Sequence, residues 1–250
     1  KHRGVDSLEF SPDPPVRRKI MRIALEEVGD IEWGEHASIF GLPLRIAQDM
    51  GIGIVLYGEN PQAEYSFGSD EAQSAVVLDR AWRERYGGLL GLRPRDFIGR
   101  EGITTKDIWA YEWPPDTAVP VFGVWLGQFF DWDGWRNALI AQEHGFETWP
   151  HAVVGDGVNY ESLDNAAVGI HDRFKYLKFG FGRASDIASL HIRRGRLTRD
   201  EGMALARRHD GLIPWSYLGW DLADVLSSLG LSLDQYFAIE DRFANKKLLV

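Results

Sequence analysis

The chain has 250 residues, of which 44% are hydrophobic and 26% charged, a composition typical of a folded globular protein and not of a disordered or fibrous one. Its formal net charge of −9 disfavours general binding to nucleic acid or to anionic membranes. The absence of cysteine excludes disulfides and thiolate metal sites, and no apolar run approaches the roughly 20 residues of a membrane-spanning helix. We therefore expect a soluble, cytoplasmic enzyme without membrane insertion.

The first part of the sequence predicts an α/β core. A short strand over residues 7–10 precedes a proline cluster and an amphipathic helix over residues 16–28, which Gly29 ends. The near-continuous apolar run Ile52–Tyr57 is typical of a strand buried on both faces of a parallel sheet. Helices are also expected over residues 44–50, 70–86 and 135–143, and a second strand over 121–129. These elements predict an α/β fold, a parallel sheet flanked by helices, with the 52–57 strand in its interior.

The second part of the sequence predicts short helices with clear start signals. Thr198–Glu201 and Ser232–Gln235 match the capping-box pattern, in which a hydroxyl and a later carboxylate or amide satisfy free backbone N–H groups. We expect two regions: an α/β core over residues 1–155, and a mainly helical portion over 156–250 that contributes to the functional site. Because a strand opens the sequence, we also expect the sheet to begin in residues that precede it.

A polar turn follows the predicted interior strand. In open α/β sheets, ligands bind outside the carboxyl ends of the strands. The sequence therefore predicts that this turn lines the main pocket and holds a nucleotide, a metal ion or a polar substrate, although a turn that is merely polar fits equally well. Its candidate ligand-binding residues are Gly58, Glu59, Asn60 and Gln62.

A glycine-containing segment is the most specific candidate site. Two glycines permit close backbone approach to a ligand, a helix predicted to begin near Ala184 offers free N–H groups, and basic side chains add charge. This pattern indicates an anion site, in which Arg183→Ala would weaken binding about tenfold to a hundredfold with little effect on folding. The alternative is a glycine turn with Phe179 and Phe181 in the core. The candidate residues are Lys178, Gly180, Gly182, Arg183 and Asp186.

A pair of aspartates precedes this segment in the sequence, and a cluster of arginines follows it. An arginine cluster at Arg193, Arg194, Arg196 and Arg199 suits phosphate or carboxylate binding, and ion pairs with the many acidic residues explain it as well. Asp131 and Asp133 either bind a metal ion or a substrate hydroxyl, or cap the following helix. The histidines show no metal-ligand spacing, so we expect no resident protein metal site.

Five stretches of the chain, residues 16–28, 57–62, 132–146, 158–161 and 175–201, together resemble bacterial N-acetyl sugar amidotransferases of surface-polysaccharide synthesis. The resemblance implies an adenine-nucleotide α-hydrolase-like fold of the PP-loop group, with ATP and Mg²⁺ as cofactors. It implies that ATP activates the N-acetyl group of a nucleotide-linked sugar, and that ammonia from a glutaminase partner converts it to an acetamidino group in lipopolysaccharide or related synthesis. On this basis Lys178, Arg183 and Asp186 are candidate catalytic residues, and Asn159 joins the ligand-binding set. The most specific part of this resemblance is the block of residues 178–199.

The sequence departs from this family at the phosphate-binding loop. The family's S-G-G-x-D-S loop is not found, since the similar run Gly4-Val5-Asp6-Ser7 follows His2-Arg3. The family's zinc-binding cysteines are also missing, because the sequence contains no cysteine. We therefore expect this chain alone not to turn over ATP. Two alternatives stay open: a non-catalytic remnant that binds the sugar or a partner, and a related PP-loop enzyme such as a tRNA-thiolating enzyme. The acidic charge and the lack of cysteine weigh against the second.

Overall fold

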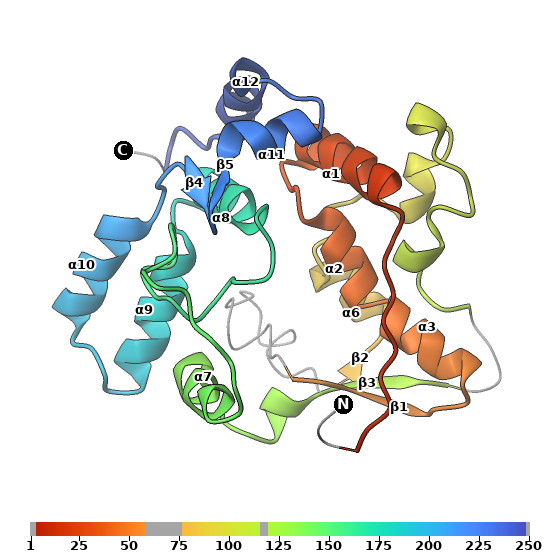
Figure 1. The fold of residues 1–250 in the computed structure, drawn as a ribbon, viewed down its shortest axis with the longest axis horizontal. Coiled ribbons are helices and arrows are strands. Elements are labelled where there is room, and N and C mark those ends of the chain that lie inside the picture. The colour runs from red at the N-terminus through yellow and green to blue at the C-terminus, as the bar shows by residue number, and fades with distance from the viewer. Residues whose placement is uncertain (1–3, 59–76, 116–119, 249–250) are drawn as a thin grey trace.

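The computed structural model describes residues 4–58, 77–115 and 120–248, and within them helices predominate over strands (Figure 1). The α-helices are α1 (Pro14–Val28), α2 (Trp33–Ile39), α3 (Leu42–Asp49), α6 (Arg80–Tyr86), α7 (Gly134–Gln142), α8 (Val168–Phe179), α9 (Arg183–Arg193), α10 (Arg199–His209), α11 (Leu222–Ser228) and α12 (Leu233–Phe243). Short 3₁₀ helices cover Pro94–Phe97, Arg100–Gly102, Trp109–Tyr111 and Leu126–Gln128.

The predicted fold class, a parallel sheet flanked by helices, is wrong for the described residues. They contain one mixed three-stranded sheet in the order β1-β3-β2, with β1 (Ile54–Tyr57) parallel to β3 (Phe122–Trp125) and β2 (Val77–Leu78) antiparallel to it. A two-stranded hairpin of β4 (Ser216–Tyr217) and β5 (Trp220–Asp221) is separate. The sheet lies at the lower edge of the view in Figure 1, and the C-terminal helices lie away from it.

The predicted interior strand is an edge strand in the described sheet. Among the described strands β1 pairs only with β3, and its residues alternate between outward and inward side chains. Ile54 and Leu56 are 58% and 61% exposed, whereas Val55 and Tyr57 pack against the aromatic cluster that includes Trp125. The apolar run failed as a predictor because periodicity alone does not distinguish a doubly buried strand from one with an exposed apolar face.

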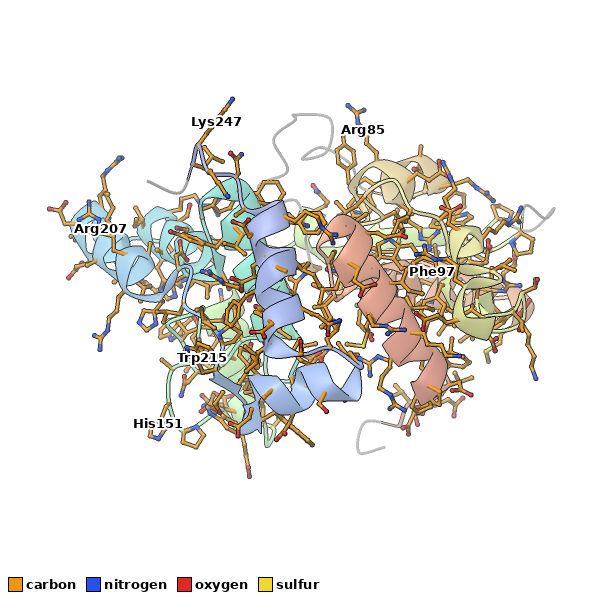
Figure 2. The ribbon with its side chains drawn as sticks, turned by 90° about the horizontal axis from the view of Figure 1, so that it is seen from above. Arg85, Phe97, His151, Arg207, Trp215 and Lys247 are labelled. Atoms are coloured by element: carbon orange, nitrogen blue, oxygen red, sulfur yellow. The ribbon has the colours of Figure 1, made fainter. Side chains whose placement is uncertain are left out.

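Helix α1 joins two hydrophobic clusters. One face of α1 packs against α2 and the 89–111 segment through Ile20, Ile23 and Ala24. Met21 and Leu25 instead pack with residues of α8, α11 and α12. Figure 2 shows α12 running beside α1, while Arg207 lies at the left end of the view and Arg85 extends outward from its upper edge. The core around α1 therefore crosses the predicted boundary at residue 155.

Local signals located several helix ends correctly. Helix α1 ends at Gly29, whose φ of 62° is left-handed, and both predicted capping boxes form at Thr198 and Ser232. Other predicted elements differ: residues 7–10 form no strand, and residues 77–78 form β2 inside the range predicted to be helical. Within the described residues, every helix is too short or too polar to cross a membrane.

Candidate functional site

A cavity of about 400 Å³ lies between α7, α9 and the loop that leads into α8. Figure 1 shows α7 next to α9. One side of this main cavity is aromatic and aliphatic, and the other carries charged and hydroxyl groups. The lining residues are Trp132, Gly134, Asn137, Ala138, Ala141, Phe146, Tyr160, Glu161, Ser162, Asp164, Val168, Arg183, Asp186, Ile187 and Leu190.

The start of α7 forms one side of the main cavity. Asp133 caps this helix by accepting a hydrogen bond from the Arg136 amide at 3.3 Å. The next residue, Gly134, faces Glu161, and a Cβ at position 134 would lie 2.5 Å from the Glu161 Oε1 atom. Only glycine therefore permits the Glu161 carboxylate to lie against the first turn of α7.

Arg183 and Asp186 bring charge to the cavity from the first turns of α9. The Arg183 Nε atom lies 3.7 Å from Oδ2 of Asp172 on α8. Asp186 forms an ion pair with Lys175, which also lies on α8. The Lys175 ammonium also lies 5.1 Å from the centre of the Phe181 ring. These contacts fix the two α9 side chains against α8 while leaving them in the cavity lining.

Buried carboxylates surround Arg183. Asp156 is fully buried and Asp172 nearly so, and their carboxylate oxygens have no hydrogen-bond partner of normal geometry in the described part of the chain. Burial and the charge of Asp172 raise the pKa of Asp156 to about 8, against the opposing effect of Arg183. Burial also raises the pKa of Glu161 and of Asp186. The site is therefore rich in carboxyl groups that hold protons more tightly than usual.

The N-terminus of α9 does not offer the open amides expected of an anion site. The Ala184 amide donates to the Gly155 carbonyl at 3.0 Å, and the Ser185 amide donates to Asp210 Oδ1 at 3.2 Å. The Ser185 hydroxyl bonds the other Asp210 oxygen at 2.6 Å. Gly182 permits this approach, because a Cβ there would lie 2.7 Å from Asp210 Oδ1. A carboxylate of the chain itself thus takes the place expected for a phosphate.

Apart from Arg183 and Asp186, the residues of the predicted glycine segment make structural contacts within the protein. Lys178 points away from the main cavity and donates to the Val28 carbonyl at the end of α1, at 2.8 Å. Gly180 ends α8 with a left-handed φ of 77°. Phe179 and Phe181 are 55% and 39% exposed, so the alternative that placed both rings in the core is also wrong.

Arg193, Arg194 and Arg196 of the arginine cluster form hydrogen bonds with neighbouring protein groups. Arg196 binds both oxygens of Asp133, at 2.6 and 2.9 Å. Arg194 donates to Asp131 at 3.2 Å and to the Trp132 carbonyl at 2.8 Å. Arg193, which donates to the Ser189 carbonyl at 3.4 Å, is not among the cavity residues either. The structure therefore matches the ion-pair interpretation for Arg194 and Arg196.

Arg196 also supports a cavity side chain from outside. Its Nε atom donates to His191 Nδ1 at 3.0 Å, and His191 Nε2 lies 3.0 Å from the Tyr160 hydroxyl. Because Nδ1 accepts from Arg196, the imidazole carries its proton on Nε2 and donates to Tyr160. Burial and the Arg196 charge lower the pKa of His191, which favours this neutral form.

The other predicted ligand-binding residues are not among the described lining of the main cavity. Gly58 is exposed, and Glu59, Asn60 and Gln62 lie outside the described residues. Asn159 does not line the main cavity; its amide donates to the Trp149 carbonyl at 2.9 Å and to the Thr148 hydroxyl at 3.3 Å. Among the predicted site residues that the structure describes, Arg183 and Asp186 line the main cavity.

Sequence reasoning missed most of the cavity. Trp132, Asn137, Tyr160 and Glu161 belong to no motif, and two separate segments bring them together. A sequence signal did exist for some of them, because residues 132–146 and 158–161 are among the stretches of family resemblance. Ser162 adds a structural signal: its φ of 57° is left-handed, which is uncommon for a residue other than glycine.

A second cavity of about 270 Å³ adjoins the first and shares Asp164 and Val168 with it. Its polar lining includes Glu32, whose carboxylate accepts two hydrogen bonds from the Asn165 amide at 2.9 and 2.8 Å. Burial raises the pKa of Glu32 to about 8. Nearby, His171 Nδ1 bonds the buried Asp30 at 2.8 Å, which gives this histidine a structural role.

The main cavity does not fit a nucleoside triphosphate or its metal ion. Among its described lining residues, Glu161, Asp164 and Asp186 carry carboxyl groups and Arg183 is the single cation. The Ala184 and Ser185 amides of α9 already donate to the Gly155 carbonyl and to Asp210. Across residues 4–58, 77–115 and 120–248, no three histidine or carboxylate side chains converge as metal ligands. Its mixture of rings, carboxylates and amide suits a neutral polar ligand such as a sugar.

The C-terminal part of the chain matches a known protein family. Residues 143–249 match the family model for the C-terminal domain of WbpG-like LPS biosynthesis proteins. This region contains α8 to α12 and the cavity residues from Phe146 to Leu190. No curated protein matches the chain. The match supports a place for this protein in lipopolysaccharide biosynthesis.

Proposed function

We propose that the main cavity binds the N-acetyl sugar of a surface-polysaccharide precursor, and that the chain is part of an ATP-dependent amidotransferase that converts the acetamido group to an acetamidino group. The observation that carries the sugar site is the composition of the cavity, in which aromatic rings face carboxylates and an amide. The family match, which covers much of this lining, supports the pathway. The resemblance to N-acetyl sugar amidotransferases supports the reaction.

The lining suits each part of an N-acetyl sugar. Trp132 and Phe146 offer ring faces for the apolar surface of a pyranose, while Asn137 and Asp186 can bond its hydroxyls. Small and aliphatic residues, Ala138, Ala141 and Leu190, leave an apolar space for the acetyl methyl group. The carboxylates disfavour a phosphate inside the cavity, so the nucleotide carrier lies outside it.

A separate protein supplies the ammonia in this proposal. The chain has no cysteine that could serve as a glutaminase nucleophile. We therefore expect free ammonium to replace glutamine when the glutaminase partner is absent. The sequence also lacks the family's S-G-G-x-D-S loop, so ATP use by this chain requires a polypeptide that carries it.

Calorimetric titration with methyl glycosides tests the sugar site. A 2-acetamido glycoside should bind, and the 2-amino glycoside, which lacks the acetyl group, should bind at least tenfold more weakly. Trp132→Ala should weaken binding of the acetamido sugar about tenfold, because a stacked ring is lost. Trp220→Ala is the matched control, since Trp220 is 60% exposed on β5 and outside the cavity. Equal effects of the two variants would refute the site.

A second assay tests the reaction. Pyrophosphate release should require ammonium, an N-acetyl sugar and a polypeptide with the phosphate loop. Turnover by this chain alone would contradict the expectation that the loop is needed. If the sugar binds but the complemented protein shows no turnover with ammonium or with glutamine and its partner, the chain is the non-catalytic sugar-binding protein that the sequence left as an alternative.

A further inference from the structure

Glu161 differs from the other acidic residues of the main cavity. Asp186 is held by Lys175, and Asp164 is exposed to solvent. Glu161 is only partly exposed, and its carboxylate forms no ion pair or hydrogen bond with any residue in the ranges that the structure describes. A partly buried carboxylate that faces a cavity without a partner is costly unless a ligand provides one.

The position of Glu161 is defined by its neighbours. Its Oε1 atom lies where a side chain at Gly134 would otherwise be, against the first turn of α7. The charged groups that act on it are Arg183 and Asp186 from α9 and Asp172 from α8. Of these, Arg183 favours the carboxylate, whereas the two aspartates and burial favour its protonated form.

The proposed reaction changes the charge of the group that this carboxylate would meet. An acetamido group is neutral and has one N–H. An acetamidino group is a planar cation with N–H groups on two nitrogens, the arrangement that pairs with both oxygens of a carboxylate, as guanidinium does. A carboxylate beside the apolar space for the methyl group therefore discriminates between substrate and product.

We propose that Glu161 binds the cationic acetamidino group of the product, so that the main cavity holds an acetamidino sugar more tightly than the corresponding acetamido sugar. The inference rests on the proposed function in one respect, the binding of the sugar in this cavity. Its consequence is that the product competes with the substrate for the site, which slows the reaction as product accumulates.

Glu161 also makes product binding dependent on pH. Burial raises its pKa, and a bound amidinium favours the ionised carboxylate, so binding releases a proton wherever Glu161 is protonated in the free protein. The affinity for the acetamidino sugar should therefore rise with pH through the titration of Glu161. The neutral acetamido sugar should show no comparable rise.

The experiment compares methyl 2-acetamido and 2-acetamidino glycosides of the same sugar by calorimetry on the complete 250-residue chain, in buffers of different ionisation enthalpy. We expect the wild-type protein to prefer the acetamidino sugar at least tenfold, as a charged hydrogen-bonded pair provides roughly 1.5–3 kcal/mol. Glu161→Gln should reduce the preference to less than about threefold and abolish the proton release. Asp164→Asn, the matched control on the exposed carboxylate, should retain both.

Each other outcome decides against the inference. If the wild-type protein binds both sugars equally, or if the preference survives Glu161→Gln, the role of Glu161 is refuted while the sugar site stands. If Asp164→Asn abolishes the preference as fully, the general acidity of the cavity is responsible, and not Glu161. If neither sugar binds, the inference fails together with the proposed function. Retained affinity of Glu161→Gln for the acetamido sugar shows that the variant is folded.

Discussion

Arg183 is the first residue of α9 and Arg196 lies just beyond its C-terminal end, and each lies beside an aspartate. Arg196 uses both terminal nitrogens on Asp133, at 2.6 and 2.9 Å, and its Nε on His191. Arg183 lies 3.7 Å from Asp172 and lines the main cavity. The sequence presents both as candidate anion-binding residues. Only their surroundings distinguish a residue that connects α9 to α7 from one that neutralises buried acids beside a ligand cavity.

The acids near each arginine differ in burial. Beside Arg183, Asp156 and Asp172 are almost completely buried, at 0% and 4% exposure. Asp133, beside Arg196, also caps α7 and has Arg194 within 4.0 Å. Removal of Arg196 thus leaves Asp133 with other partners, whereas removal of Arg183 leaves two buried carboxyl groups without their cation. Four variants break or sharpen this comparison.

The largest effect should come from Arg183→Ala. We expect the free energy of unfolding to fall by about 3–5 kcal/mol, because one partner of a buried charged group is removed. The sequence alone led us to expect little effect on folding; the 15% exposure of the Arg183 side chain is the reason for the change. Chemical denaturation measures the loss. In an Asp172→Asn background the same substitution should cost less, and a loss below about 1 kcal/mol in the single variant would show that water reaches the cluster.

Asp156 should make stability fall as the pH rises. Its pKa is about 8 in the folded protein and near 3.8 when unfolded, so between these values the folded state binds more protons than the unfolded state. The free energy of unfolding should decrease across pH 4 to 8, at up to about 1.4 kcal/mol per pH unit for one such group. Asp156→Asn should flatten this dependence, measured by denaturation at several pH values. Glu32, with a pKa also near 8, should keep part of the slope in that variant.

Arg196→Ala should have a smaller effect on stability, about 1–2 kcal/mol, because its charged hydrogen bonds are only partly buried. The affinity for the acetamido sugar should change less than threefold, since Arg196 does not line the cavity and acts on it through Asp133 and His191. Parallel denaturation and calorimetry check both values. A loss of affinity equal to that of Trp132→Ala would show that Arg196 positions the ligand through its contacts with neighbouring residues.

Lys178→Met should have the smallest effect. The substitution keeps most of the apolar stem and removes the hydrogen bond to the Val28 carbonyl, which should cost about 1 kcal/mol. Sugar affinity should not change, because Lys178 lies outside the main cavity. A large loss of affinity with unchanged stability would restore the ligand-binding role that the sequence first suggested for this lysine.

The candidate site was only partly predictable. Arg183 and Asp186 were identified because charge follows a glycine segment at a helix start, and both line the main cavity. Lys178 and the later arginines share that sequence pattern, but their partners lie far along the chain: Val28 for Lys178, and Asp131 and Asp133 for Arg194 and Arg196. Charge at a given sequence position does not reveal which distant group neutralises it.

What the sequence determined by itself is local. The caps at Thr198 and Ser232 and the left-handed end of α1 at Gly29 depend on hydrogen bonds and backbone angles within a few residues, so their signals lie in short stretches of sequence. The tertiary structure decided the rest. It placed β1 at the edge of a small mixed sheet, filled the start of α9 with the Asp210 carboxylate, and joined α7 to α9 around Glu161. These outcomes depend on contacts between segments distant in sequence, which hydrophobic periodicity and residue type do not specify.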